Sequence, residues 1–249
     1  MSAVAVILAA GKGTRMKSDL PKVAVPLAGK ALLLHVLEHL VTAGVKSMVI
    51  VVGHQKEVVQ DLVPDIPGVD IRFAEQTVQK GTAHAVLAAE ETLKDFQGDV
   101  LVTCGDMPRI RPATFQKLLS EHGSDGRAVT LCTARLDDPF PYGRIVRDAA
   151  GAVEKIVEEK DADEATKKIQ EVNSGTYVFR GPEIFSVLRA IDTQNAQQEY
   201  YLTDVVAQYR SRSEKVGSVL MEDAEEVLGV NSKEDLEALE KKIKGQMAV

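Results

Sequence analysis

A glycine turn near the start of the chain brings together residue types that bind phosphate. It follows the apolar run Val4–Leu8, whose β-branched residues are typical of a strand buried on both faces. The turn has few side chains, and its bare backbone N–H groups and missing Cβ atoms suit an anion. It contains Ala9, Ala10, Gly11 and Gly13, with the cations Lys12, Arg15 and Lys22 in and after it. We interpret the turn as a nucleotide-phosphate site at the carboxyl end of the first strand.

This turn matches neither of the two common phosphate-binding glycine loops. The dinucleotide fingerprint G-x-G-x-x-G requires glycine where this chain has Met16. A P-loop requires Ser or Thr after its lysine, and here Gly13 follows Lys12. An ordinary glycine-rich turn between a strand and a helix is the alternative interpretation.

A second polar strand end lies further along the chain. Asp106 follows Gly105 directly after the apolar run 100–104. A carboxylate in this position suits a divalent cation, because Mg²⁺ binds through one or two carboxylates together with substrate phosphates. A turn-forming aspartate before Met107-Pro108 is the structural alternative. Open α/β sheets bind ligands beyond the carboxyl ends of their strands, so the glycine turn and Asp106 are expected at one edge.

The composition limits the possible classes of function. The 249 residues carry a net charge of −7 and an isoelectric point of about 5.4, which argues against a general nucleic-acid binder with a basic face. Cys104 and Cys132 have neither metal nor redox spacing, so a reduced cytoplasmic setting is expected. The sequence shows no recognisable signal peptide and no apolar run near the roughly 20 residues that span a membrane, so no membrane partner is expected.

The elements that must position these residues alternate between strands and helices. Apolar runs predict strands at 4–8, 48–52, 71–74, 100–104 and 129–134, and helical spacing predicts helices at 32–41, 58–62, 82–93 and 112–122. Thr82 is predicted to cap its helix. This alternation indicates an α/β fold with a mainly parallel sheet and helices on both faces.

After about residue 135 the pattern changes. We predict short strands at 144–147 and 153–157, an interrupted strand at 172–180, a late strand at 216–221, and helices at 182–191, 199–209 and 232–244. The charged segment 158–170 is predicted to be a solvated surface. The chain is predicted to be one domain, 1–249, with a nucleotide-binding half to about 135, a substrate-binding half of about 136–231, and a C-terminal helix at 232–249.

Short motifs in a fixed order give the chain a family resemblance. They are L-A-A-G-K-G-T-R-M (8–16), S-D-L-P-K (18–22), Q-T-V-Q-K-G-T-A-H-A (76–85), Y-G-R-I (142–145), I-V-E-E-K-D-A (156–162), E-V-N-S-G (171–175), N-A-Q-Q-E-Y-Y-L-T-D (195–204) and G-V-N (229–231). Together they resemble the sugar-1-phosphate nucleotidylyltransferases, above all the uridylyltransferase domain of the bacterial bifunctional N-acetylglucosamine-1-phosphate uridylyltransferases. The resemblance implies a Rossmann-like three-layer sandwich of the nucleotide-diphospho-sugar transferase type, with a smaller sugar-binding β region.

The resemblance also implies roles for individual residues. Arg15 and Lys22 would neutralise the triphosphate of UTP during catalysis. The nucleotide would be bound by Leu8, Ala9, Ala10, Gly11, Gly13, Gln76, Gln79, Gly81 and Thr82. A glutamine amide both donates and accepts, which suits the edge of uracil. Asp106 and Asn231 would hold Mg²⁺. Gly143, Glu158, Asn173, Tyr201 and Thr203 would bind the sugar phosphate, N-acetylglucosamine-1-phosphate.

Two features depart from the family pattern. Cys104 stands where members typically carry tyrosine, so one wall of the sugar site is expected to differ. The sequence contains no hexapeptide β-helix repeat, so acetyl transfer and the trimer built by that domain are not expected, and the oligomeric state is left open. The alternatives are transfer to another sugar-1-phosphate or from another nucleotide, and a nucleotide-binding regulatory protein without turnover.

Overall fold

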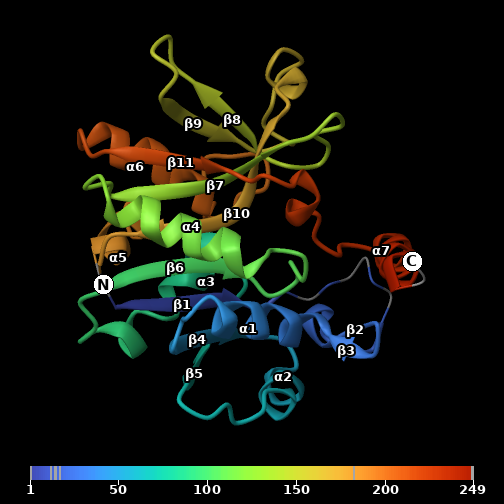
Figure 1. Cartoon of the computed structure of the whole chain (residues 1–249). Coiled ribbons are helices and arrows are strands. Elements are labelled where there is room, and N and C mark those ends of the chain that lie inside the picture. The colour runs from blue at the N-terminus through green and yellow to red at the C-terminus, as the bar shows by residue number, and fades with distance from the viewer. Residues whose placement is uncertain (1, 12, 14–15, 17, 182, 248–249) are drawn as a thin grey trace.

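A nine-stranded sheet forms the centre of the molecule (Figure 1). The computed structural model describes residues 2–11, 13, 16, 18–181 and 183–247, without the side chains of 244–247. The main path of the sheet runs β11-β7-β10-β6-β1-β4-β5, with β8 and β9 attached beside β10. The strands are β1 (Ala3–Leu8), β4 (Ser47–Val52), β5 (Asp70–Glu75), β6 (Asp99–Cys104), β7 (Val129–Arg135), β8 (Arg144–Arg147), β9 (Val153–Val157), β10 (Glu171–Phe179) and β11 (Val216–Leu220), and a separate hairpin joins β2 (Pro26–Leu27) to β3 (Lys30–Ala31).

Helices cover both faces of this sheet. The α-helices are α1 (Leu32–Thr42), α2 (Lys56–Leu62), α3 (Thr82–Leu87), α4 (Pro112–Gly123), α5 (Glu183–Leu188), α6 (Val205–Ser211) and α7 (Lys233–Met247). Short 3₁₀ turns are η2 (Lys22–Ala24), η3 (Glu91–Leu93), η4 (Thr166–Lys168), η5 (Leu202–Asp204) and η6 (Ala224–Val227). Among these described helices, none is long and apolar enough to pass through a membrane.

The central strand β1 shows why its sequence is an uninterrupted apolar run. Val4 and Val6 pack into a core cluster with residues of α3, α5 and α6. Ala5 and Ile7 point to the opposite face and pack with residues of α1, α2 and α4. Because successive strand residues alternate between the faces, a strand covered on both sides needs apolar residues throughout. The predicted three-layer α/β architecture is confirmed.

Strand β10 is the antiparallel member of the main path. Four of the six neighbouring strand pairs on that path are parallel, as predicted, whereas β10 runs against both β6 and β7. The chain reaches β10 from the β8–β9 hairpin rather than through a crossover helix, and this return path reverses its direction. Its pairing with β7 shifts register between Asn173 and Tyr177, around Gly175 at φ +79°. The predicted interruption of this strand is therefore a bulge.

The segment 199–204 corrects a predicted helix. Residues 199–201 are not helical, and helix α6 begins only at Val205 after the η5 turn. The backbone of Tyr200 instead pairs with the segment before α3: its N–H donates to the Lys80 carbonyl at 2.8 Å, and its carbonyl accepts from Ala83 at 2.9 Å. Thr82 also differs from prediction, since Gly81 takes the N-cap position and the Thr82 hydroxyl accepts from the Leu202 N–H at 3.0 Å.

Helix α7 lies beside the β2–β3 hairpin at the margin of the fold (Figure 1). Its first turn forms a reciprocal cap, in which Ser232 Oγ accepts from the Asp235 N–H at 3.1 Å and the Asp235 carboxylate accepts from the Ser232 N–H at 2.9 Å. The predicted start of this helix is thereby confirmed. Leu239 belongs to a small core cluster with Leu27 and Val230, and the partly buried Leu236 and Ile243 pack against that cluster.

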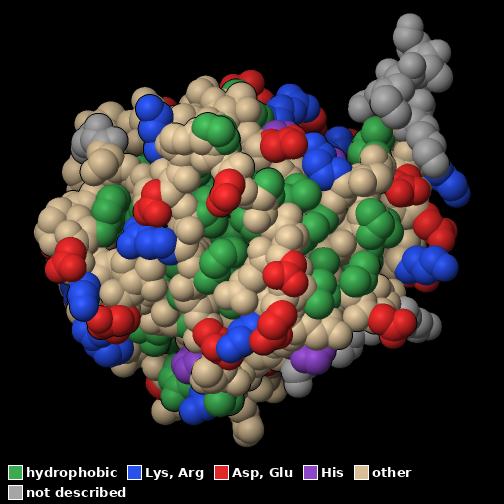
Figure 2. Space-filling view, turned by 90° about the horizontal axis from the view of Figure 1, so that it is seen from below, with side chains coloured by type: hydrophobic (Ala, Val, Ile, Leu, Met, Phe, Trp, Pro, Cys, Tyr) green, Lys and Arg blue, Asp and Glu red, His purple; other side chains and the backbone are tan. Residues whose placement is uncertain are grey.

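The edge strand β5 leaves apolar side chains near the surface. Ile71 and Phe73 are partly buried and pack against the second core cluster, as do Val63 and Val69. Figure 2 views the molecule from the side of β5 and α2, where hydrophobic side chains are interspersed with charged ones. Ion pairs such as Lys56–Glu75 border the strand. Charged side chains at a sheet edge disfavour pairing with another chain.

At Gly81 the segment 80–83 packs closely against the segment 200–202. Its φ is +113°, and a Cβ there would lie 2.5 Å from the Tyr200 carbonyl oxygen. We predict that Gly81→Ala lowers the free energy of unfolding by about 1–3 kcal/mol or more, measured by urea denaturation. Gly68→Ala is the matched control, because Gly68 also has positive φ but open space around a Cβ. Equal losses in the two variants would show that the close approach of Tyr200 is unimportant.

Candidate functional site

Two adjoining pockets lie beyond the carboxyl ends of the central strands. One has a volume of about 280 Å³ and is bordered by the glycine turn and the segment before α3. The other has a volume of about 260 Å³ and is bordered by the β8–β9 hairpin and the bulge of β10. Leu8, Thr82 and Cys104 line both pockets. We call them the nucleotide pocket and the sugar pocket, after the roles predicted for their residues.

The glycine turn forms one wall of the nucleotide pocket. Leu8, Ala10 and Gly11 line it, whereas Ala9 is buried and donates its N–H to the Val51 carbonyl at 2.9 Å. A Cβ on Gly13 would lie 2.6 Å from Lys22 Cβ, so glycine at this position allows Lys22 to approach the turn. Arg15, predicted to be catalytic, lies outside the described residues.

Two glutamines form another wall of the nucleotide pocket. The Gln76 side chain is buried, and its amide nitrogen donates to the Gly81 carbonyl at 3.2 Å. The same nitrogen lies 3.1 Å from His84 Nδ1. Burial, followed by the charge of Lys80, lowers the pKa of His84, which favours the neutral ring that can accept there. Gln79 donates to the Ala10 carbonyl and thereby joins this wall to the glycine turn. Gly81 and Thr82 complete the wall.

A lysine lies between the two predicted metal ligands. The Lys22 ammonium contacts the Asp106 carboxylate and donates to Asn231 Oδ1 at 2.7 Å. The Lys22 and Asp106 side chains are only 13% and 22% exposed, so the ion pair is weakly screened by solvent. The two side-chain oxygens thus converge on one cationic group.

This oxygen pair fits a divalent cation. Carboxylate and carboxamide oxygens are the ligands that Mg²⁺ prefers, and the ammonium marks where their lone pairs meet. Within the described part of the chain, no cluster of three or more His, Cys, Asp or Glu side chains is placed to hold a metal. An ion at Asp106 and Asn231 would therefore take further oxygens from water or from a bound phosphate, as Mg²⁺ commonly does.

The sugar pocket contains a carboxylate in an unfavourable environment. Burial, together with the nearby Asp204 and Asp161, raises the pKa of Glu158. The Thr203 hydroxyl lies beside this carboxylate and offsets part of the shift, but it is buried without hydrogen-bond geometry to any described group. A buried hydroxyl without a partner beside a half-buried carboxylate is suited to a polar ligand. Glu158 is half-buried and lines this pocket, so the prediction that 158–170 is a solvated surface does not hold at its first residue.

The bulge of β10 lines the sugar pocket. Asn173 donates from its amide to the Tyr177 hydroxyl at 2.7 Å and accepts from the Gly175 N–H at 3.2 Å, which fixes its orientation. A Cβ on Gly143 would lie 3.1 Å from the Ile156 side chain and 3.4 Å from the Glu158 carboxylate, so a larger residue would crowd Glu158. Tyr201 is 6% exposed and does not line either pocket, so the structure does not bring it to the ligand surface.

An aspartate near the sugar pocket affects stability. Burial, with contributions from Asp192 and Asp161, raises the pKa of Asp204 to about 6. Between the ordinary pKa of an aspartate, about 4, and this value, the folded protein holds a proton that the unfolded chain has released. The free energy of unfolding therefore decreases as the pH rises through this window.

Several pocket residues were not among those predicted. Glu199 and Ala85 line the nucleotide pocket, and Tyr142, Ser174 and Leu202 line the sugar pocket. All five lie inside or beside the short motifs noted in the sequence. The motifs indicated that these stretches of the chain form the site. Only the fold shows which residues of each motif line a pocket.

Comparison with known proteins places this geometry in a family. A family model described as "Nucleotidyl transferase" matches residues 4–236. The "Bifunctional protein GlmU" of Syntrophotalea carbinolica is 46% identical over 93% of this chain and 49% of its own length. The protein of the same name from Streptococcus mutans is 46% identical over 97% of this chain and 52% of its own length. The chain thus spans about half the length of the curated relatives it matches.

A solved structure shares the fold. The crystal structure of UDP-glucose pyrophosphorylase complexed with UDP-glucose superposes with a TM-score of 0.79, covering 99% of this chain and all of the other, at 18% identity. This likeness confirms the predicted nucleotide-diphospho-sugar transferase architecture. With the matching family model and the 46% identity of the relatives, it leads to one assignment. The chain belongs to the nucleotidyl transferase family.

Proposed function

We propose that this protein transfers the uridylyl group of UTP to N-acetylglucosamine-1-phosphate, forming UDP-N-acetylglucosamine and pyrophosphate. The observation that carries the proposal is the convergence of Lys22, Asp106 and Asn231 at the adjoining pockets. Cations are needed there, because a triphosphate and a sugar phosphate repel each other. The resemblance to uridylyltransferases and the identity with the GlmU proteins support the choice of reaction.

In the proposed reaction, an oxygen of the sugar phosphate attacks the α-phosphorus of UTP in line, and pyrophosphate leaves. Gly11 and Gly13 bring backbone N–H groups to the phosphates, and Lys22 and Arg15 supply positive charge as charge shifts to the leaving pyrophosphate. Nucleotidyl transferases of this family generally use a divalent metal ion, and we assign Mg²⁺ to Asp106 and Asn231. A bound Mg²⁺ would neutralise phosphate charge and favour in-line geometry. No covalent enzyme intermediate is required.

The base assignment rests on Gln76 and Gln79. Uracil presents one N–H and two carbonyl oxygens, and an amide side chain can serve both kinds of group. Gln76 already donates to Gly81 and faces His84, so its orientation is fixed before the base arrives. Such preorganisation lowers the entropic cost of binding.

The sugar assignment rests on Glu158 and Asn173. An ionised Glu158 accepts hydrogen bonds from sugar hydroxyls. Asn173 uses one N–H on Tyr177 and one lone pair on Gly175, which leaves a second N–H and a second lone pair for an acetamido group. Gly143 and Thr203 would border the sugar phosphate, and Tyr201 would act from behind the pocket surface. The whole chain, 1–249, would work as one domain whose two halves supply the two pockets.

One assay tests the proposal and its alternatives. Pyrophosphate release is measured for a panel of nucleoside triphosphates and sugar-1-phosphates, with and without Mg²⁺. We expect the highest kcat/KM with UTP and N-acetylglucosamine-1-phosphate, and none without a divalent metal ion. Preference for another pair would change the substrate, and no release with any pair would favour a binding protein without turnover.

Lys22 and Asp106 are predicted to differ in their effect on metal binding. We expect Lys22→Ala and Asp106→Asn each to lower kcat about 100- to 1,000-fold. Because the Lys22 ammonium occupies the same two oxygens as the metal, Lys22→Ala should leave Mn²⁺ affinity unweakened, whereas Asp106→Asn should weaken it. Equilibrium dialysis with Mn²⁺ measures this difference. Lys94→Ala is the control, because its ion pair with Glu91 is exposed. Normal turnover of either site variant would remove the role assigned to it.

Gln76 is predicted to select the base. We expect Gln76→Glu to raise the KM for UTP about 10- to 100-fold, because the substitution removes a buried donor and adds a charge that has no partner. The KM for the sugar phosphate should change much less. Gln116→Glu makes the same chemical change at an exposed position of α4 and should have no effect. A KM for UTP that stays within two-fold of the parent value would exclude base contact by Gln76.

Glu158 is predicted to make sugar binding depend on pH. Its pKa is raised by burial, so the carboxylate becomes protonated at a higher pH than an ordinary glutamate. We expect the KM for the sugar phosphate to rise as the pH falls, because the protonated acid accepts fewer hydrogen bonds. Glu158→Gln should raise this KM at every pH and lose that part of the pH dependence. The comparison between the two proteins removes the titration of the sugar phosphate itself. Matching pH profiles would count against Glu158 as a ligand.

A further inference from the structure

The two proposed metal ligands come from loops that the sheet does not place side by side. Asp106 follows β6, and Asn231 lies beyond β11. Strands β7 and β10 lie between β6 and β11 in the sheet. The segment 221–230 must therefore cross the ends of two strands before Asn231 can reach Asp106.

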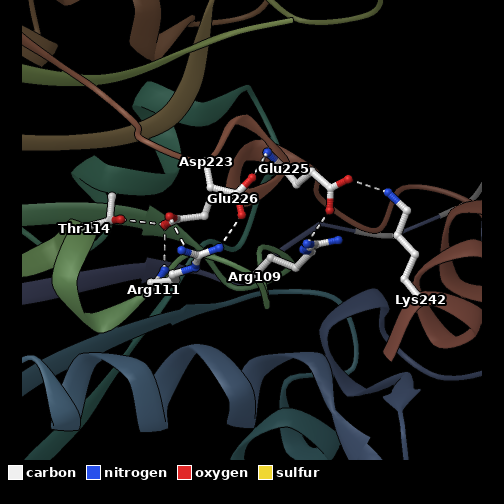
Figure 3. A network of polar contacts seen from close by, with 7 residues as sticks. All are labelled: Arg109, Arg111, Thr114, Asp223, Glu225, Glu226 and Lys242. Carbon is white, nitrogen blue, oxygen red and sulfur yellow. Dashed lines mark hydrogen bonds and ion pairs between the residues drawn. The ribbon is translucent and has the colours of Figure 1, made fainter. Parts of the chain in front are cut away.

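A buried carboxylate ties this crossing segment to the loop after β6 (Figure 3). Glu226 is 2% exposed, and its Oε2 accepts from the Arg111 N–H at 2.9 Å and from the Thr114 hydroxyl at 2.6 Å. Its other carboxylate oxygen lies 3.6 Å from Arg111 Nε. Arg111 is the N-cap residue of α4, and its own side chain does not cap the helix. A carboxylate from a segment more than 100 residues away thus occupies the start of α4, where the helix dipole favours negative charge.

More exposed ion pairs surround Glu226 (Figure 3). Arg109 pairs with Glu225 at 2.5 Å, and Glu225 also pairs with Lys242 of α7 at 2.6 Å. Arg111 pairs with Asp223. The Glu225 side chain is 43% exposed, so its pairs contribute little to stability. Glu226 is therefore the most buried of the three carboxylates that connect the two loops.

The connection ends at the metal ligands themselves. The Val230 N–H donates to the Asp106 carbonyl at 3.1 Å, one residue before Asn231. Val227 is buried next to Glu226 and packs in the cluster that contains Met107 and Ile110 of the other loop. The backbone around each ligand is thus held against that of the other.

We propose that Glu226 is a positioning residue that sets the spacing of the Asp106 and Asn231 oxygens and so the affinity for the divalent ion that accompanies UTP. The inference rests on the proposed function, because it assumes the metal at these two residues. Groups that orient metal ligands typically change metal affinity by about 10- to 100-fold when removed. Glu226 contacts neither Lys22 nor any residue of the nucleotide pocket through its hydrogen bonds.

The test separates metal positioning from general structure. The Kd of UTP is measured by calorimetry without divalent ions and with saturating Mn²⁺. The metal-free Kd divided by the Kd in Mn²⁺ reports how much the metal strengthens UTP binding. For Glu226→Ala we expect the metal-free Kd to stay within two-fold of the parent value and the ratio to fall about ten-fold or more. Glu226→Gln, which keeps an acceptor oxygen, should give an intermediate ratio. Glu222→Ala is the matched control, because Glu222 lies on the same segment and its pair with Lys117 of α4 is exposed.

Each outcome separates the inference from the proposed function. If Asp106→Asn leaves the ratio unchanged, the metal assignment is wrong. If Asp106→Asn lowers the ratio to about one, and folded Glu226→Ala keeps a ratio within two-fold of the parent value, only the positioning role is overturned. Should Glu226→Ala fail to fold, Thr114→Val decides, because it removes one donor to Glu226 at nearly constant volume. A parent-like ratio in Thr114→Val and Glu226→Gln would then overturn the inference, and a reduced ratio would support it.

Discussion

The rest of this structure depends on the contact of the Lys22 ammonium with one oxygen of Asp106 and one of Asn231. Lys22, Asp106 and Asn231 come from three distant parts of the chain and meet within hydrogen-bond distance. Charges that are largely withdrawn from water must be paired, since an unpaired one is costly. The fold must therefore deliver all three side chains together. Strands β1 and β6 do so as parallel neighbours for the first two, and the crossing segment after β11 delivers the third.

The layers of the fold could be predicted from the sequence because their cause is local. A strand such as β1, covered on both faces, must be apolar at every position, and the sequence shows this directly. The direction of β10 could not be predicted, because a buried apolar run has the same pattern in a parallel or an antiparallel strand. The non-helical segment at Tyr200 was missed for another reason. Its apolar residues have helical spacing, but backbone hydrogen bonds to Lys80 and Ala83 determine its conformation.

The site was predictable to the extent that its chemistry lies in short motifs. Asp106 was identified from its place at a strand end, whereas the pairing with Asn231 came from the family resemblance. Tyr201 has the residue type of a sugar ligand, but its ring is turned into the interior. The burial of Glu226 could not be predicted from the sequence, since this residue stands in an acidic stretch typical of a solvated surface. Its burial depends on donors from Arg111 and Thr114, which are distant in the sequence.

The described residues that the two pockets share include no activated nucleophile. Cys104 lines both pockets, and burial next to Asp106 raises the pKa of its thiol to about 12, so it stays protonated. A protonated thiol is a poor nucleophile, which agrees with the direct transfer proposed above. In the proposed reaction, direct transfer would bring two phosphates together in a protein whose net charge is −7. The attraction would then come from local positive charge, which makes the placement of Lys22 and of the two oxygens beside it the condition for the proposed reaction.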